Sequence, residues 1–162
     1  MYRPVLELAS AEIDRYVSKS KRPVIKIAGA IGRTSQAVQE AQMARELGYH
    51  AVLLSLAAFK QESNKTVLRH CREVAKTMPL VGFYLQPSVG GRVLDREFWQ
   101  GFAEIENVVA IKIAPFNTYR TLDVLTGVAL SGRSKEIALY TGNDDHIVLD
   151  LINGQLALLD QG

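Results

Sequence analysis

Lys112 stands inside an apolar run that spans residues 108–113. An ammonium group is costly to bury, so a lysine in such a run either pairs with a carboxylate or gives up its proton. The free amine of a lysine can attack a carbonyl carbon and form a Schiff base. Position alone does not decide between these roles, because Lys26 also stands in an apolar run, residues 23–29. Either lysine can instead pair or extend its ammonium to solvent.

Tyr84 is the feature that separates the two lysines. It lies near the end of the run 80–85, which precedes the run that contains Lys112. If the two runs form neighbouring parallel strands, their carboxyl ends lie at the same edge of a sheet. A phenol at that edge could pass a proton to and from an adduct on Lys112. The alternative is a tyrosine packed at the rim of the sheet with its hydroxyl in water.

Short apolar segments alternate with amphipathic segments along the whole chain. We expect strands at residues 23–29, 51–56, 80–85, 108–113 and 137–141. We expect helices at about 10–18, 35–47, 64–77 and 118–130, with others from about residue 95 and after residue 145. The apolar runs are continuous rather than alternating, which is typical of parallel strands with both faces buried.

Two α/β architectures accommodate these five strand–helix units. One is an open, doubly wound sheet, and the other is an incomplete TIM (βα)8 barrel, since five strands are too few to close eight. Periodicity does not choose between them. In both architectures ligands gather at the carboxyl ends of the strands, so chemistry is expected there.

Composition limits the classes of partner. The net charge is +2, and the basic residues are scattered, so no nucleic-acid partner is expected. No apolar run approaches the roughly 18 residues of a membrane span, so no membrane partner is expected. Cys71 is the only cysteine, which excludes an internal disulfide and favours a cytoplasmic protein with a buried helix thiol. The length of 162 residues suits a single domain over residues 1–162.

Several segments resemble the dihydrodipicolinate synthase / N-acetylneuraminate lyase family. In that family a Tyr-Asn-x-Pro segment carries a catalytic tyrosine and the next strand carries a Schiff-base lysine. Tyr84-Leu85-Gln86-Pro87 and Lys112 are similar to these, and the interval from Tyr84 to Lys112 fits the family. Weaker similarities, in the same order as in the family, lie at residues 24–32, 44–54 and 140–144.

The resemblance implies roles for five residues. Lys112 would form the imine, Tyr84 would relay protons, and Ser55, Gly142 and Asn143 would bind the substrate. It also implies a class I aldolase-type lyase on a 2-oxo acid or related carbonyl compound, with no metal and no organic cofactor. The chain would correspond to roughly the third to seventh βα units of a barrel.

The chain also departs from the family pattern. The family's second strand has a Gly-[Thr/Ser]-[Thr/Ser]-Gly-Glu motif, which this sequence lacks. Residues 153–159 do not resemble the eighth strand, and Val89 replaces the arginine that follows the tyrosine motif in the synthases. These changes weigh against dihydrodipicolinate synthesis itself. Open sheet edges and exposed core favour a homo-oligomer.

Three functions therefore remain open. The first is an active lyase completed by self-association or by a partner chain. The second is a catalytically inactive truncated barrel that acts as an interaction or small-ligand-binding module. The third is a phosphate binder that uses residues 29–35 at a helix start, although this loop lacks the lysine of a P-loop. Residues 144–146 are expected to be an acidic helix start rather than a metal site, and His50 and His70 are expected at the surface or rim.

Overall fold

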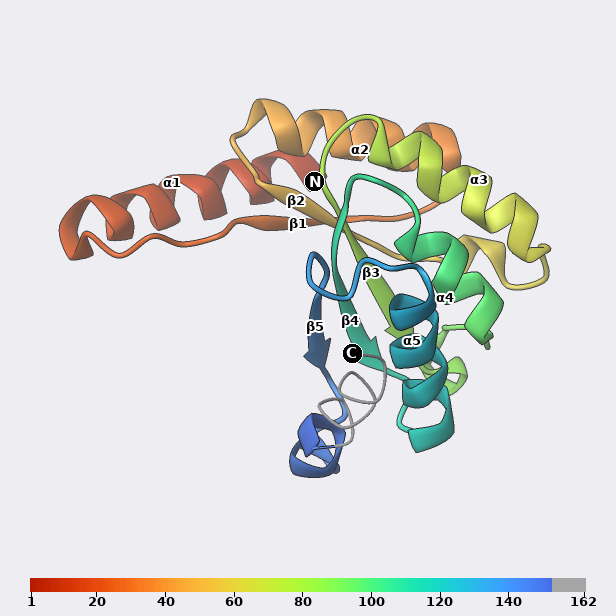
Figure 1. Cartoon of the computed structure of the whole chain (residues 1–162). Coiled ribbons are helices and arrows are strands. Elements are labelled where there is room, and N and C mark those ends of the chain that lie inside the picture. Colours follow the sequence, from red (N-terminus) through yellow and green to blue (C-terminus); the bar gives the residue numbers. More distant parts are fainter. Residues whose placement is uncertain (153–162) are drawn as a thin grey trace.

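The computed structural model describes residues 1–152, so the segment 153–159, expected not to form an eighth strand, lies outside the described residues. One open sheet holds five parallel strands in the order β1-β2-β3-β4-β5 (Figure 1). The strands are β1 (Ile27–Ala30), β2 (Ala51–Leu54), β3 (Leu80–Leu85), β4 (Val108–Ala114) and β5 (Ala138–Thr141). The prediction of five parallel strands alternating with helices is confirmed.

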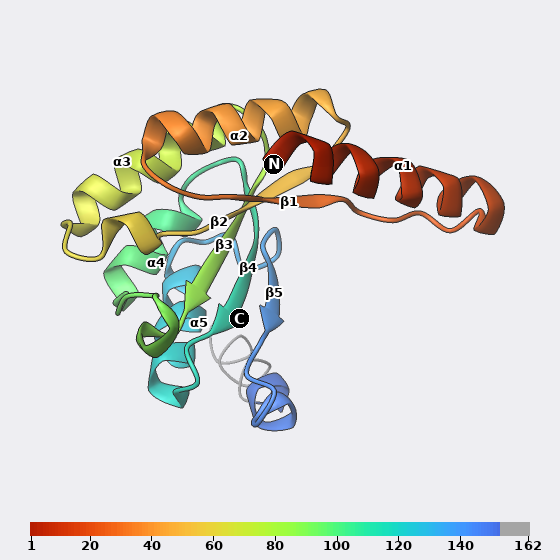
Figure 2. The same ribbon diagram turned by 180° about the vertical axis from the view of Figure 1, so that it is seen from behind.

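Helices follow the strands in regular alternation. They are α1 (Tyr2–Ser20), α2 (Thr34–Glu46), α3 (Asn64–Ala75), α4 (Arg96–Ala103) and α5 (Thr118–Leu130), with short 3-10 turns η1 (Ala57–Phe59) and η2 (Pro87–Val89). Helices α2 to α5 lie along one face of the sheet, and α1 runs outward beside β1 (Figure 2). The sheet therefore has a helix-covered face and a second face that none of these helices covers.

The two faces carry different side chains because successive residues of a strand point to opposite sides. The helix-covered face holds the main core, in which Val52, Leu80 and Ile111 are fully buried. We call the other side the open face. The open face carries Ile27, Ala51, Leu53, Val81, Phe83, Ala110, Lys112 and Tyr140. Its centre is a small buried cluster built on Ala51, Val81 and Ala110, and its margins are exposed.

Three helices begin where their sequence provides a capping side chain. The Ser63 hydroxyl accepts a hydrogen bond from the backbone of Thr66 at the start of α3. Asp95 accepts at 2.8 Å from the Phe98 backbone amide at the start of α4. Asn117 does the same for Arg120 and starts α5 directly after the strand that contains Lys112. These caps explain why the predicted starts of the three helices agree with the structure.

The first strand differs most from its prediction. It was expected at residues 23–29 but pairs with β2 only from Ile27 onward. At Lys26 the carbonyl still accepts from the backbone amide of His50 at 2.9 Å, but the amide donates to Nδ1 of the His50 side chain, also at 2.9 Å, in place of a strand partner. His50 is exposed at the rim, as expected. Among the described strands, β1 and β5 each have one neighbour, so both edges of the sheet are unpaired there.

Candidate functional site

Lys112 lies on the open face near the carboxyl end of β4. In the parallel register it stands opposite Phe83 of β3 and Tyr140 of β5. Its ammonium group lies 5.2 Å from the centroid of the Phe83 ring, a distance at which a cation is attracted to the ring face. The side chain is exposed and forms no salt bridge with a carboxylate of residues 1–152.

Lys26 has the structural role that sequence position left open for both lysines. Its side chain is buried, and its ammonium contacts Asp14 Oδ1 at 2.5 Å. The same nitrogen donates to the hydroxyl of Ser10 at 2.8 Å. Lys26 therefore joins α1 to the sheet as an ion pair. Of the two lysines in apolar runs, only Lys112 presents its amine on the open face.

Tyr84 lies on the opposite face of the sheet from Lys112. Its neighbour on β4 is Ile113, and its side chain is 1% exposed. The hydroxyl donates to the carbonyl of Leu94 at 3.0 Å and accepts from the amide of Leu94 at 3.1 Å. Its ring packs 5.1 Å from that of Trp99, and burial raises the pKa of the phenol. The structure does not bring Tyr84 and Lys112 together.

A local irregularity explains why the interval from Tyr84 to Lys112 did not place these two residues side by side. Leu80 pairs with Val108, but Val81 pairs with Ala110, so the register shifts by one residue between these pairs. Such a bulge leaves one residue of β4 without an opposite partner. A one-residue shift exchanges the two faces of a strand. Phe83 therefore takes the position beside Lys112 that Tyr84 was expected to occupy.

Gly142 lies directly beside the side chain of Lys112. Its amide donates to the carbonyl of Ile113 at 2.6 Å, which ties the end of β5 to the end of β4. A Cβ atom at this position would come within 3.3 Å of Lys112 Cε and 3.0 Å of Ala114 Cβ. The absence of a side chain thus leaves room for the lysine to extend.

Ser55 and Asn143 lie at the same end of the sheet but differ in setting. Ser55 lines a small hollow together with Phe83, and its amide donates to the carbonyl of Ala30 at 2.9 Å. Asn143 is 2% exposed, and its side-chain oxygen accepts from the Phe116 amide at 2.8 Å. Its Nδ2 donates to Asp150 at 2.7 Å and to the hydroxyl of Thr121 at 3.2 Å. The hydrogen bonds of the Asn143 side chain therefore hold neighbouring segments of the chain together.

Tyr140 is the residue at this site that sequence reasoning missed. It stands on the open face, opposite Lys112 in the register of β4 and β5, and is 58% exposed. The available signal was the repeat itself, because Tyr140 follows Lys112 by the same interval at which Lys112 follows Tyr84. The register between β4 and β5 has no shift, so that interval holds there.

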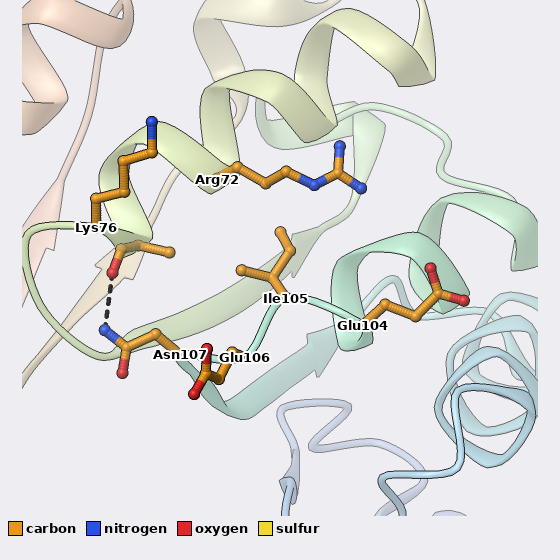
Figure 3. Close-up of a pocket in the computed structure, with 7 residues that line it drawn as sticks. Arg72, Lys76, Glu104, Ile105, Glu106 and Asn107 are labelled. Carbon is orange, nitrogen blue, oxygen red and sulfur yellow. Dashed lines mark hydrogen bonds between the residues drawn. The ribbon is translucent and has the colours of Figure 1, made fainter.

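A further hollow lies away from Lys112. It has a volume of about 560 Å³ and is lined by Arg72, Lys76, Glu104 and Asn107 among others (Figure 3). It lies at the amino end of β4, because Asn107 directly precedes that strand and donates to the carbonyl of Ala75 at 2.7 Å. In barrel enzymes this end of the sheet serves stability rather than catalysis.

His70 is buried, which corrects the expectation of a surface or rim position. It is 2% exposed, and the centroid of its ring lies 4.3 Å from that of Phe59, with the two rings tilted by 30°. The amphipathic pattern of α3 turns it toward the core, where its Nδ1 lies 3.0 Å from the Thr34 hydroxyl. Burial, aided by the positive charge of Arg33, lowers the pKa of the imidazole to about 4.

Neither a membrane-spanning helix nor a metal cluster is found within residues 1–152. None of the helices there combines the length and the apolar character needed to cross a bilayer. No group of three or more histidine, cysteine or acidic side chains within that range is placed to hold a metal ion. Cys71 is buried in α3, as expected, and burial raises the pKa of its thiol to about 12.

Solved structures match this fold at low sequence identity. YagE, a prophage protein of E. coli K12 in complex with pyruvate, has a TM-score of 0.79 and 18% identity; the match covers 94% of this chain and 49% of that chain. The dihydrodipicolinate synthase of Thermotoga maritima has a TM-score of 0.76 and 18% identity, covering 94% and 50%. Because the five strands correspond to about half of each structure, the sheet is an incomplete (βα)8 barrel.

Curated sequences extend the comparison. The 4-hydroxy-tetrahydrodipicolinate synthase of Staphylococcus saprophyticus is 31% identical over 127 residues, which are 78% of this chain and 41% of the relative. The enzyme of that name from Caldicellulosiruptor bescii is 29% identical over 156 residues, 95% and 50% of the two chains. The chain thus spans about half the length of the curated relatives it matches. Residues 8–155 match the sequence model of the dihydrodipicolinate synthetase family, and the chain belongs to that family.

Proposed function

We propose that this chain contributes the imine-forming lysine of a Schiff-base lyase that acts on a 2-oxo acid or a related carbonyl compound. One observation supports this most directly. Of the two lysines in apolar runs, Lys26 forms an ion pair with Asp14, whereas Lys112 presents its amine near the carboxyl end of the sheet. That end is where barrel enzymes carry their chemistry.

The reaction begins with the neutral amine of Lys112. Its lone pair attacks the carbonyl carbon, a C–N bond forms, and a proton passes from nitrogen to oxygen to give a carbinolamine. Protonation of the hydroxyl then releases water and leaves an iminium ion. In cleavage the iminium accepts the electron pair of the C–C bond that breaks and becomes an enamine; in condensation the iminium loses an α proton to give an enamine, which donates its electron pair to the new C–C bond. Pyruvate is the first compound to test, because the solved family structure from E. coli K12 is a complex with pyruvate.

Completion of the barrel is part of the proposal. A nucleophilic lysine gains reactivity when it is desolvated or placed near another cation, and the described structure leaves Lys112 exposed. Additional strands at β1 and β5 would cover the open face and exclude water from the amine. We propose a homo-oligomer or a partner chain as their source. The cytoplasmic location stays a prediction that rests on the single cysteine.

Borohydride trapping tests the proposal. The folded chain is incubated with pyruvate or with a small set of 2-oxo acids and aldehydes, reduced, and analysed by intact mass and peptide mapping. We expect a reduced adduct on Lys112 that is absent from Lys112→Met. Lys135→Met, which removes an exposed lysine elsewhere, should trap like the parent chain. A folded sample with no adduct on any lysine would refute the lyase proposal and favour the catalytically inactive binding module.

For the other predicted site residues we propose more limited roles. Gly142 leaves space for Lys112, and Ser55 lines the hollow next to Phe83. The substrate contact predicted for Asn143 would require it to leave hydrogen bonds that it already makes. The proton relay predicted for Tyr84 would require its hydroxyl to leave Leu94 and reach the open face, and the variant Tyr84→Phe tests it.

A further inference from the structure

Three adjacent strands place aromatic rings on both sides of Lys112. Phe83 of β3 and Tyr140 of β5 are its partners in the parallel register, and all three side chains stand on the open face. Neighbouring strands lie about 4.8 Å apart, so long side chains at paired positions come within contact of one another. Phe83 has no exchangeable proton. Tyr140 is the neighbour of Lys112 that can donate or accept one.

Hydrogen bonding distinguishes Tyr140 from Tyr84 and Tyr49. The hydroxyl of Tyr84 is bonded to Leu94, and the hydroxyl of Tyr49 donates to the carbonyl of Leu6 at 3.0 Å. Within residues 1–152 no hydrogen bond engages the hydroxyl of Tyr140, and its side chain is 58% exposed. Its phenol is therefore available to a group bound at Lys112.

We infer that Tyr140 is the catalytic phenol of the Lys112 site, an inference that rests on the proposed imine chemistry. The phenol donates its proton to the hydroxyl of the carbinolamine, the C–O bond breaks, and water leaves. The iminium ion forms on Lys112, and the phenolate left on Tyr140 balances its charge. A proton from solvent then restores the phenol. No oxidant, reductant or further reactant is required.

Rates of borohydride trapping provide the first test. General acid–base catalysis contributes about 10²–10⁴-fold, so Tyr140→Phe should slow adduct formation on Lys112 at least tenfold. Tyr119→Phe, which removes an exposed phenol on α5, is the matched control and should trap within about twofold of the parent chain. Tyr84→Phe tests the competing prediction, in which the relay is the phenol on the helix-covered face.

The outcomes separate the inference from the proposed function. No adduct in the parent chain overturns the proposed function, and the catalytic role of Tyr140 with it. A normal adduct that Tyr140→Phe forms at an unchanged rate overturns the role of Tyr140 alone. A large loss in the rate of adduct formation in Tyr84→Phe, with an unchanged rate in Tyr140→Phe, would assign the proton relay to Tyr84 instead.

A second measurement tests the pairing without any substrate. Because Lys112 and Tyr140 are opposite each other in the register of β4 and β5, NMR should show nuclear Overhauser effects between the ring protons of Tyr140 and the side-chain protons of Lys112. The ring of Tyr119 on α5 is the internal control and should show none with Lys112. The absence of a Tyr140–Lys112 effect in the folded chain would overturn the inferred pairing.

Discussion

Removing the hydroxyl of Tyr84 should weaken the fold and leave the chemistry at Lys112 intact. The hydroxyl makes two hydrogen bonds to the backbone of Leu94, a residue that is only 2% exposed. In Tyr84→Phe the amide and the carbonyl of Leu94 lose this partner in a place that water does not reach. A buried polar group left without a partner costs about 1–3 kcal/mol, while the packing of the ring on Trp99 is retained. We therefore expect a loss of about 2 kcal/mol in the free energy of unfolding.

Urea unfolding measured by tryptophan fluorescence gives that free energy directly, since Trp99 is the only tryptophan and lies against Tyr84. For a domain of this size, a loss of about 2 kcal/mol lowers Tm by roughly 4–8 °C. Tyr119→Phe, at a site that is 80% exposed, should change neither quantity. A Tyr84→Phe chain with unchanged stability but no trapping at Lys112 would refute the assignment of Tyr84 to the core.

Three further predictions concern single groups. Gly142→Ala places a methyl group 3.3 Å from Lys112 Cε, so adduct formation should slow several-fold while circular dichroism stays unchanged. The pKa of His70 falls from 6.5 to about 4 on folding, so the unfolded chain binds more protons between these values and stability falls as pH falls through that window. Urea unfolding at pH 5 should show about 2 kcal/mol less stability than at pH 7.5, and His70→Gln should remove most of that difference. The Cys71 thiol, buried with a pKa of about 12, should react with a thiol reagent at pH 8 only after unfolding; rapid reaction of the native chain would contradict its burial.

Much of the fold could be predicted because its strands read as continuous apolar runs separated by helical segments. These runs predict burial on both faces of the sheet, whereas helices of the described structure cover only one face, and Ile27 and Tyr140 are exposed on the other. The bounds of β3 and α5 agree with the prediction, since turn residues and a capping asparagine mark their ends. The start of β1 could not be predicted from its apolar run. Residues before Ile27 extend past the beginning of β2, where a strand partner is no longer available for continued pairing.

The candidate site was harder to predict, because its composition depends on register rather than on residue type. The burial of His70 illustrates the same limit on a helix, where adjacent residues point in directions about 100° apart and a neighbouring position can face the surface instead of the core. Lys26 and Lys112 read alike in the sequence, and the contact that separates them comes from Asp14, which lies on a different element from Lys26. The ion pair between Lys26 and Asp14 could not be assigned from the sequence, because it depends on how the backbone folds between these two residues.

The register shift between β3 and β4 decides which groups can take part in chemistry at Lys112. With an unshifted register along β3, Lys112 would face the phenol of Tyr84. The bulge places Phe83 there instead and turns Tyr84 into the core. A Schiff-base site still requires a group that moves protons, and β5 presents Tyr140 at the matching position on the other side. The same interval therefore fails between Tyr84 and Lys112 but holds between Lys112 and Tyr140, and the difference is one unpaired residue in β4.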